Sequence, residues 1–141
     1  MKIILLIGKA NSGKTTTCRL LKDYLVKNGG AKIICKGLRQ VNISKKDNSD
    51  FSFLCEYKGK KVLISSQGDQ PSKVKHRIDK YTKLIKDGIF VFACRENFTK
   101  VINFAMKKAK ENFYMVQTQK VENDKEDNER VKNEIIQLIE F

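Results

Sequence analysis

Residues 2–21 read KIILLIGKANSGKTTTCRLL, and three kinds of local sequence follow one another within this stretch. Lys2 to Gly8 is a continuous apolar run of strand length that ends at a glycine, which is typical of a strand buried on both faces of a sheet. From Thr15 to Asn28, apolar residues recur at helical spacing, and Gly29 and Gly30 supply a stop signal. The stretch therefore predicts a strand, a glycine-containing loop and a helix, in that order.

The loop itself, GKANSGKT at Gly8 to Thr15, fits the pattern G-x-x-x-x-G-K-[ST] at every fixed position. Glycines let the backbone curl until successive N–H groups point at one anion, and the N-terminus of the next helix adds a positive dipole. The lysine then reaches the β- and γ-phosphates of a nucleotide, and the last hydroxyl binds Mg²⁺. The pattern predicts that a nucleoside triphosphate is held by Gly8, Ala10, Asn11, Ser12, Gly13, Lys14, Thr15 and Thr16, with Thr15 as a metal ligand.

Strand and helix patterns alternate through the rest of the chain. Strands are predicted at residues 31–38, 89–95 and 112–118, and a hairpin at residues 51–66 turns at Gly59. Helices are predicted at residues 72–87, 98–110 and 127–139. We therefore expect a single α/β domain over residues 1–141, with three layers, a mostly parallel sheet, one antiparallel hairpin strand and helices on both faces.

This sequence resembles the P-loop NTPase superfamily. The Gly8–Thr15 motif carries the resemblance, and the order of strands and helices agrees with it through most of the chain. The resemblance implies that the strand ending at Gly8 lies in the middle of the sheet, between the second hairpin strand and the strand at residues 89–95. It also implies that ligands bind at the carboxyl ends of these strands, where a neighbouring strand usually supplies an aspartate that orients the metal.

The stretch VLISSQGDQP, Val62 to Pro71, is where that aspartate is expected. Compared with the GTPase form D-x-x-G, the glycine agrees at Gly68, but a serine, Ser65, stands in the place of the acid. Asp69 follows directly. In one interpretation Asp69, or Ser65 through a water molecule, completes the Mg²⁺ shell or positions the nucleophile, and Gly68 lets the backbone approach the γ-phosphate. In the other, Asp69 or Ser72 only caps the helix that starts near Pro71.

Two further segments are candidates for the site. Arg95 follows the strand at residues 89–95, where a guanidinium would stabilise charge that develops during phosphoryl transfer; the alternative is a surface ion pair with Glu96. The polar segment Arg39–Asp50 is either a switch or substrate-binding segment or a disordered surface loop. His76 is expected to face solvent on its helix.

The function expected from these residues is ATP binding with Mg²⁺, although another nucleoside triphosphate stays possible. The [NT]-K-x-D motif of guanine-specific relatives is absent after the last strand, which continues VQTQKVEND. Lys14, Asp69 and Arg95 would then catalyse hydrolysis of the γ-phosphate or its transfer to a small acceptor. The alternatives are a non-catalytic, nucleotide-dependent switch that binds a protein partner, and a small ATPase that acts on nucleic acid.

Composition limits the remaining possibilities. The formal net charge is +13, but the lysines are spread along the whole chain, which favours a generic basic surface over a nucleic-acid site. Four widely spaced cysteines and a single histidine argue against a zinc site or a disulfide framework, and free buried thiols are expected. No apolar run approaches the roughly 18–20 residues of a membrane span, so no membrane partner and a cytoplasmic location are expected.

Overall fold

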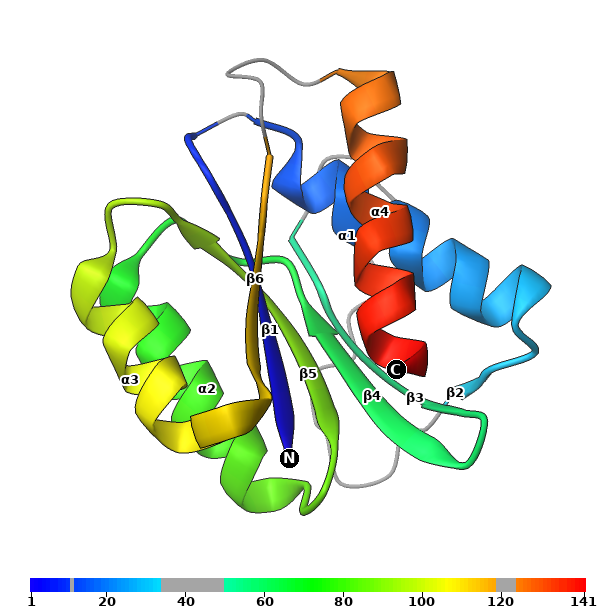
Figure 1. Cartoon of the computed structure of the whole chain (residues 1–141), viewed down its shortest axis with the longest axis horizontal. Helices are drawn as coiled ribbons and strands as arrows, with labels where there is room; N and C mark the ends of the chain where they lie inside the picture. Colours follow the sequence, from blue (N-terminus) through cyan, green and yellow to red (C-terminus); the bar gives the residue numbers. More distant parts are fainter. Residues whose placement is uncertain (11, 34–49, 119–123) are drawn as a thin grey trace.

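The computed structural model of the chain describes residues 1–10, 12–33, 50–118 and 124–141. In chain order its elements are β1 (Lys2–Gly8), α1 (Lys14–Asp23), a π-helical turn (η1, Tyr24–Asn28), β2 (Lys32–Ile33), β3 (Ser52–Tyr57), β4 (Lys60–Ser65), α2 (Pro71–Leu84), β5 (Ile89–Arg95), α3 (Thr99–Ala109), a 3₁₀ turn (η2, Lys110–Asn112), β6 (Phe113–Gln117) and α4 (Lys125–Glu140). The strands form one sheet in the order β2-β3-β4-β5-β1-β6 (Figure 1). β3 runs antiparallel to β2 and β4, and the other described pairings are parallel. This confirms an α/β fold with a mostly parallel sheet and one antiparallel strand.

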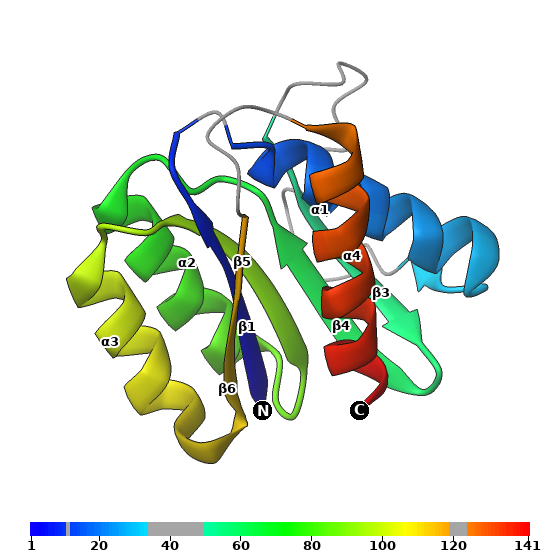
Figure 2. The same ribbon diagram turned by 45° about the horizontal axis from the view of Figure 1, so that its top comes forward.

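The helices cover the sheet on both faces, which confirms the three layers. α1 and α4 lie on one face, and α2 and α3 lie on the other (Figures 1 and 2). Because successive side chains of a strand point to opposite faces, Ile4 and Leu6 of β1 join the core under α1 and α4, whereas Ile3 and Leu5 join the core under α2 and α3. Each of these four side chains is fully buried, which stabilises the fold by about 1.5–3 kcal/mol per side chain.

Of the two strands expected beside β1, the one at residues 89–95 is confirmed and the second hairpin strand is wrong. β1 does lie between two parallel strands, but these are β5 and β6, and the second hairpin strand β4 pairs with β5 instead. β5 is therefore inserted between the Gly8–Thr15 loop and the end of β4. The reason is that β5 is buried along its apolar length from Ile89 to Cys94 and needs a strand on each side, whereas β6 is half-exposed and suits the edge.

Most element boundaries agree with the prediction. The hairpin turns at Lys58 and Gly59, whose φ values of 50° and 78° fit a tight two-residue turn. α2 ends at Leu84, earlier than expected, since Ile85 is already extended. Of the strand expected at residues 31–38, the structure describes Lys32–Ile33 as β2; residues 34–38, and all of Arg39–Asp50 except Asp50, lie outside the described residues.

Two compositional expectations can be compared with the structure. Cys18, Cys55 and Cys94 are buried free thiols, as expected, and Cys35 lies outside the described residues. Within the described parts of the chain, no helix combines the length and apolar character needed to cross a membrane.

Candidate phosphate-binding site

The Gly8–Thr15 loop connects the carboxyl end of β1 to the first turn of α1, in the order predicted. Gly13 has φ = 90°, a left-handed conformation that favours glycine, and it immediately precedes Lys14, the first residue of α1. At Gly8, an added Cβ would lie 2.1 Å from Thr118 Oγ1 and 2.6 Å from Ser12 Oγ. Gly13 is therefore favoured by its backbone conformation, and Gly8 by the close approach of the Thr118 and Ser12 side chains. Asn11 lies outside the described residues.

The start of α1 has the features of an anion-binding helix N-terminus. The first turn of α1 contains no acidic residue, and Gly13 provides no side-chain cap. The N–H groups of this turn precede the first intrahelical bond, from Thr17 N to Gly13 O at 2.8 Å. Ser12 Oγ is fully buried and has no hydrogen-bond partner among the described residues. An oxyanion at this helix N-terminus would supply the missing acceptor, so the residues present fit a phosphate group.

Lys14 places a buried ammonium group at the same loop. Its side chain is only 7% exposed, and Nζ donates hydrogen bonds to Lys9 O at 2.6 Å and to Gly8 O at 3.4 Å. Burial lowers the pKa of Lys14 below its ordinary value of 10.5, and Arg95 lowers it further, whereas Asp69 raises it. A buried cation whose hydrogen-bond partners, within the described residues, are backbone carbonyls gains strongly from an anionic ligand.

The acid nearest Thr15 is one that the sequence pattern did not indicate. Asp50, immediately before Phe51 and the start of β3, accepts a hydrogen bond from Thr15 Oγ1 at 3.0 Å and one from Ser66 Oγ at 3.4 Å. Within the described residues Asp50 takes part in no ion pair, although the chain has 29 lysines and arginines. Because β3 is antiparallel, its start lies beside the carboxyl ends of the parallel strands.

The two serines that replace the expected acid hold this end of β3 in place. Ser65 Oγ lies 3.2 Å from Ser52 Oγ across the hairpin, and Ser66 Oγ accepts from Phe51 N at 2.8 Å. The backbone of Ser66 also donates to Phe51 O at 2.9 Å. Both serines are almost fully buried. The serines at the end of β4 thus hold the segment that contains Asp50, just before β3.

Asp69 and Arg95 lie together beside Lys14. Asp69 Oδ1 accepts from Arg95 Nε and Nη2, each at 3.4 Å, and their side chains are 60% and 36% exposed. Glu96, the surface partner considered for Arg95, instead accepts a hydrogen bond from Gln117. Asp69 does not cap α2: the N-cap is Gln70, which makes no side-chain cap bond. Asp69 and Arg95 are therefore paired with each other on the Lys14 side of the site.

Gly68 has a packing role that the motif comparison did not predict. A Cβ at this position would lie 2.7 Å from the backbone of Ala93 in β5. The close approach to β5 alone requires a glycine here, whether or not a ligand approaches its backbone. His76, as expected, is exposed on α2.

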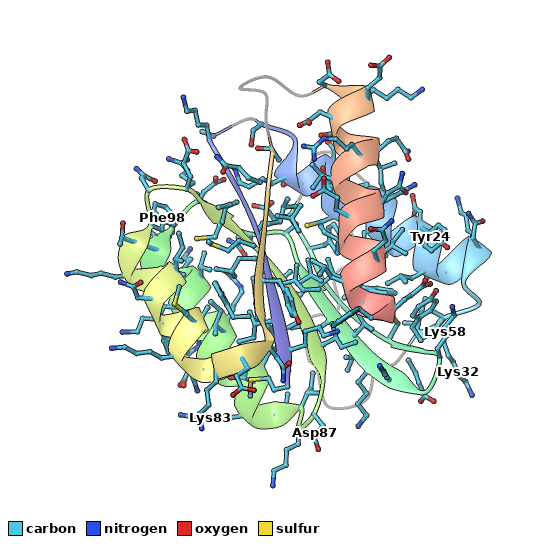
Figure 3. The ribbon with its side chains drawn as sticks, in the orientation of Figure 1. Tyr24, Lys32, Lys58, Lys83, Asp87 and Phe98 are labelled. Carbon is cyan, nitrogen blue, oxygen red and sulfur yellow. The ribbon has the colours of Figure 1, made fainter. Side chains whose placement is uncertain are left out.

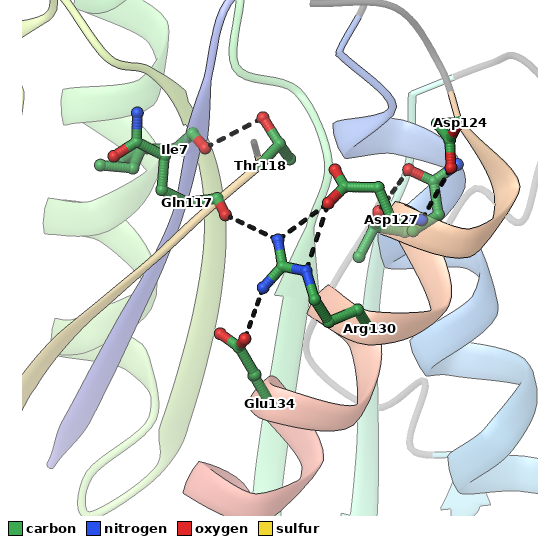
Figure 4. Close-up of polar contacts among 9 residues, drawn as sticks. Ile7, Gln117, Thr118, Asp124, Asp127, Arg130 and Glu134 are labelled. Atoms are coloured by element: carbon green, nitrogen blue, oxygen red, sulfur yellow. Dashed lines mark hydrogen bonds and ion pairs between the residues drawn. The ribbon is translucent and has the colours of Figure 1, made fainter. Parts of the chain in front are cut away.

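A second set of polar contacts fixes the end of β6 beside the loop (Figure 4). Thr118 N donates to Ile7 O at 3.0 Å, next to Gly8. The guanidinium of Arg130, on α4, donates to Gln117 O at 3.3 Å and to Asp127 Oδ1 at 2.8 Å. Helix α4 is also joined to α1, since Thr17 Oγ1 donates to Asn128 Oδ1 at 3.2 Å. Sequence periodicity could not indicate the contacts of Thr118 with Ile7 and of Asn128 with Thr17, because these residues are far apart in the chain.

The donor atoms around Thr15 fit Mg²⁺. Among the described residues there is no group of three or more His, Cys, Asp or Glu side chains that could hold a metal ion. Mg²⁺, however, usually takes only one or two protein oxygens together with phosphate oxygens and waters. The Thr15 hydroxyl and the Asp50 carboxylate form such a set, and Asp69 is the second acidic candidate.

The site therefore combines a loop at a helix N-terminus, a buried lysine and a carboxylate that accepts a hydrogen bond from the first threonine of the helix. We compared the chain with known proteins in three ways. No protein-family model matches it, and searches of curated proteins and of solved structures also found no match.

Proposed function

We propose that the Gly8–Thr15 loop binds the phosphates of a nucleoside triphosphate, ATP in the first instance, together with Mg²⁺. The observation that carries this proposal is the buried ammonium of Lys14 at an acid-free helix N-terminus, beside the fully buried Ser12 hydroxyl that has no partner among the described residues. A neutral ligand would leave the lysine charge uncompensated, whereas a polyphosphate matches both the charge and the hydrogen-bond donors.

Each residue has a distinct role in this proposal. Lys14 holds the β- and γ-phosphates, and Gly8, Ala10, Asn11, Ser12, Gly13 and Thr16 complete the loop that surrounds them. Thr15 and Asp50 hold Mg²⁺, which when bound neutralises the phosphate oxygens. The Thr15 hydroxyl donates to Asp50, so its lone pairs remain free for the metal. The metal role expected for Asp69 stays a prediction.

The proposed reaction is hydrolysis of the γ-phosphate or its transfer to a small acceptor. Arg95 would leave Asp69 to stabilise charge on the transferred phosphoryl group, and Asp69 would then be free to orient the attacking hydroxyl or water. The same ion pair favours a second candidate function. Asp69 and Arg95 form an ion pair with each other. If nucleotide binding broke this pair, the resulting change at the surface could be recognised by a protein partner, as in a nucleotide-dependent switch.

The test is a titration with ATP and Mg²⁺ by calorimetry, followed by a phosphate-release assay on the same protein. Saturable binding together with turnover supports the enzyme. Saturable binding without turnover, either alone or with small-molecule acceptors, supports the switch. If the protein binds neither ATP nor any other nucleoside triphosphate, the proposal is wrong in both forms.

A further inference from the structure

The positive charge of the molecule is concentrated on one of its two helical layers. Helices α2 and α3 with the turns that end them, residues 71–88 and 99–112, contain ten lysines and arginines against three acidic residues. The other layer, residues 14–28 and 125–140, contains seven against six. Figure 3 shows long side chains, Lys83 among them, that project outward from α2 and α3. The spacing of lysines along the sequence did not predict this separation, because the two layers alternate along the chain.

An open groove of about 990 Å³ lies on this basic face between α2 and α3. The residues that line it include His76, Asp79 and Phe104. Four lysines also line it, namely Lys75, Lys100, Lys107 and Lys108. Asp79 forms ion pairs with Lys108 at 2.9 Å and with Lys83 at 3.0 Å. Among the described residues Lys75, Lys100 and Lys107 are in no ion pair, so the groove keeps an excess of positive charge.

An aromatic ring lies among these cations. Phe104 is half-buried in the groove, and the ammonium groups of Lys75 and Lys108 lie over its ring, at 5.1 and 5.3 Å from the centroid. A stacked base would take the place of one of these ammonium groups on the ring. A positively charged groove with an aromatic platform is the arrangement by which proteins bind single strands: lysines contact the phosphates and a base stacks on the ring. An acidic peptide would match the charge, but its Asp and Glu side chains have no planar face to stack on the ring.

We propose that the α2–α3 groove binds single-stranded nucleic acid, with Lys75, Lys100 and Lys107 contacting phosphates and Phe104 stacking on a base. The groove is close to the phosphate-binding site, because α2 begins at Pro71, two residues after Asp69. Arg77 of α2 also donates a hydrogen bond to the side chain of Gln67. The binding claim does not depend on the proposed nucleotide function, and it is tested without nucleotide.

The test uses fluorescence anisotropy with labelled oligothymidylate and oligouridylate of about 20 nucleotides, in buffers of about 50 and 200 mM salt. Three lysine–phosphate contacts predict a slope of log affinity against log salt of about −2.1, which is roughly a 20-fold loss over this range. In the triple variant Lys75→Ala, Lys100→Ala and Lys107→Ala, the slope is expected to become shallower by about 2. Phe104→Leu is expected to weaken binding by about 5-fold or more, with the slope unchanged.

The matched control removes three lysines elsewhere: Lys27→Ala, Lys61→Ala and Lys125→Ala. All three are exposed, and the net charge of this variant equals that of the groove variant. The proposal predicts that the control keeps most of the affinity. Equal losses in the two triple variants would overturn it, as would no binding of either oligonucleotide. Tighter binding of duplex DNA, or binding of polyglutamate that the groove variant loses equally, would also overturn it.

Discussion

Replacing Asp50 with asparagine separates a metal-binding role of this residue from a structural role. A metal-binding role predicts weaker ATP binding with Mg²⁺ and stronger ATP binding without it, whereas a structural role predicts equal weakening under both conditions. Asp50 accepts hydrogen bonds from Thr15 Oγ1 at 3.0 Å and from Ser66 Oγ at 3.4 Å, and asparagine keeps an oxygen that can accept both. Because position 50 is also exposed, the free energy of unfolding is expected to change by less than about 0.5 kcal/mol. Only the negative charge is lost. If that charge helps to hold Mg²⁺, the affinity for Mg²⁺–ATP should fall by about 10- to 100-fold.

Without Mg²⁺ the same substitution should strengthen ATP binding. A carboxylate beside the phosphates then only repels them, and one unit charge at about 6 Å in water is worth about 0.7 kcal/mol, or roughly 3-fold in affinity. Calorimetry with ATP in excess Mg²⁺ and in EDTA measures both effects, and Asp69→Asn is the matched comparison. Equal weakening of ATP binding under both conditions would show that Asp50 is structural. A larger Mg²⁺ effect in Asp69→Asn than in Asp50→Asn would transfer the metal role to Asp69.

Three other predictions concern packing and protonation. Gly68→Ala should lower the free energy of unfolding by about 1–3 kcal/mol in urea denaturation, because its Cβ would lie 2.7 Å from the Ala93 backbone; an unchanged midpoint would contradict this packing role. Burial raises the pKa of Cys18 and of Cys55 to about 12 and that of Cys94 to about 11, so peptide mapping should find all three unalkylated in the folded protein at pH 9, where an exposed thiol reacts. Burial also lowers the pKa of Lys14 in the free protein, and bound phosphate would raise it. The affinity for ATP should therefore be full below the lowered pKa and should fall as the pH rises through it. A calorimetric series with constant affinity up to pH 10.5 would refute the role of Lys14.

Much of the fold could be predicted because local patterns determine it. The apolar run of β1, the amphipathic stripes of α1 to α4 and the turn at Lys58 and Gly59 are each specified by residues close together in the chain. The neighbours of β1 could not be predicted in this way. The order of parallel strands depends on which strand is buried on both sides, and β4 and β5 have similar apolar cores.

In the candidate site too, features formed by neighbouring residues could be predicted from the sequence, and features formed by distant residues could not. The Gly8–Thr15 loop is one continuous segment, and its glycines could be recognised from their spacing. Asp50 could not, since it lies 35 positions after Thr15 in the chain and does not directly follow a predicted strand. Only the antiparallel pairing of β3 with β4 brings it to Thr15, through the buried serines Ser65 and Ser66.

The central claim is that Lys14 and its loop bind the phosphates of a nucleotide, and the most direct measurement compares the Mg²⁺–ATP affinity of the wild-type protein with that of Lys14→Ala. The account predicts saturable binding by the wild-type protein. It also predicts a loss of at least about 100-fold in the variant, because two or more charge-assisted hydrogen bonds disappear. Circular dichroism and the urea midpoint would show that the variant is folded. Equal affinities of the two folded proteins for Mg²⁺–ATP would contradict the claim.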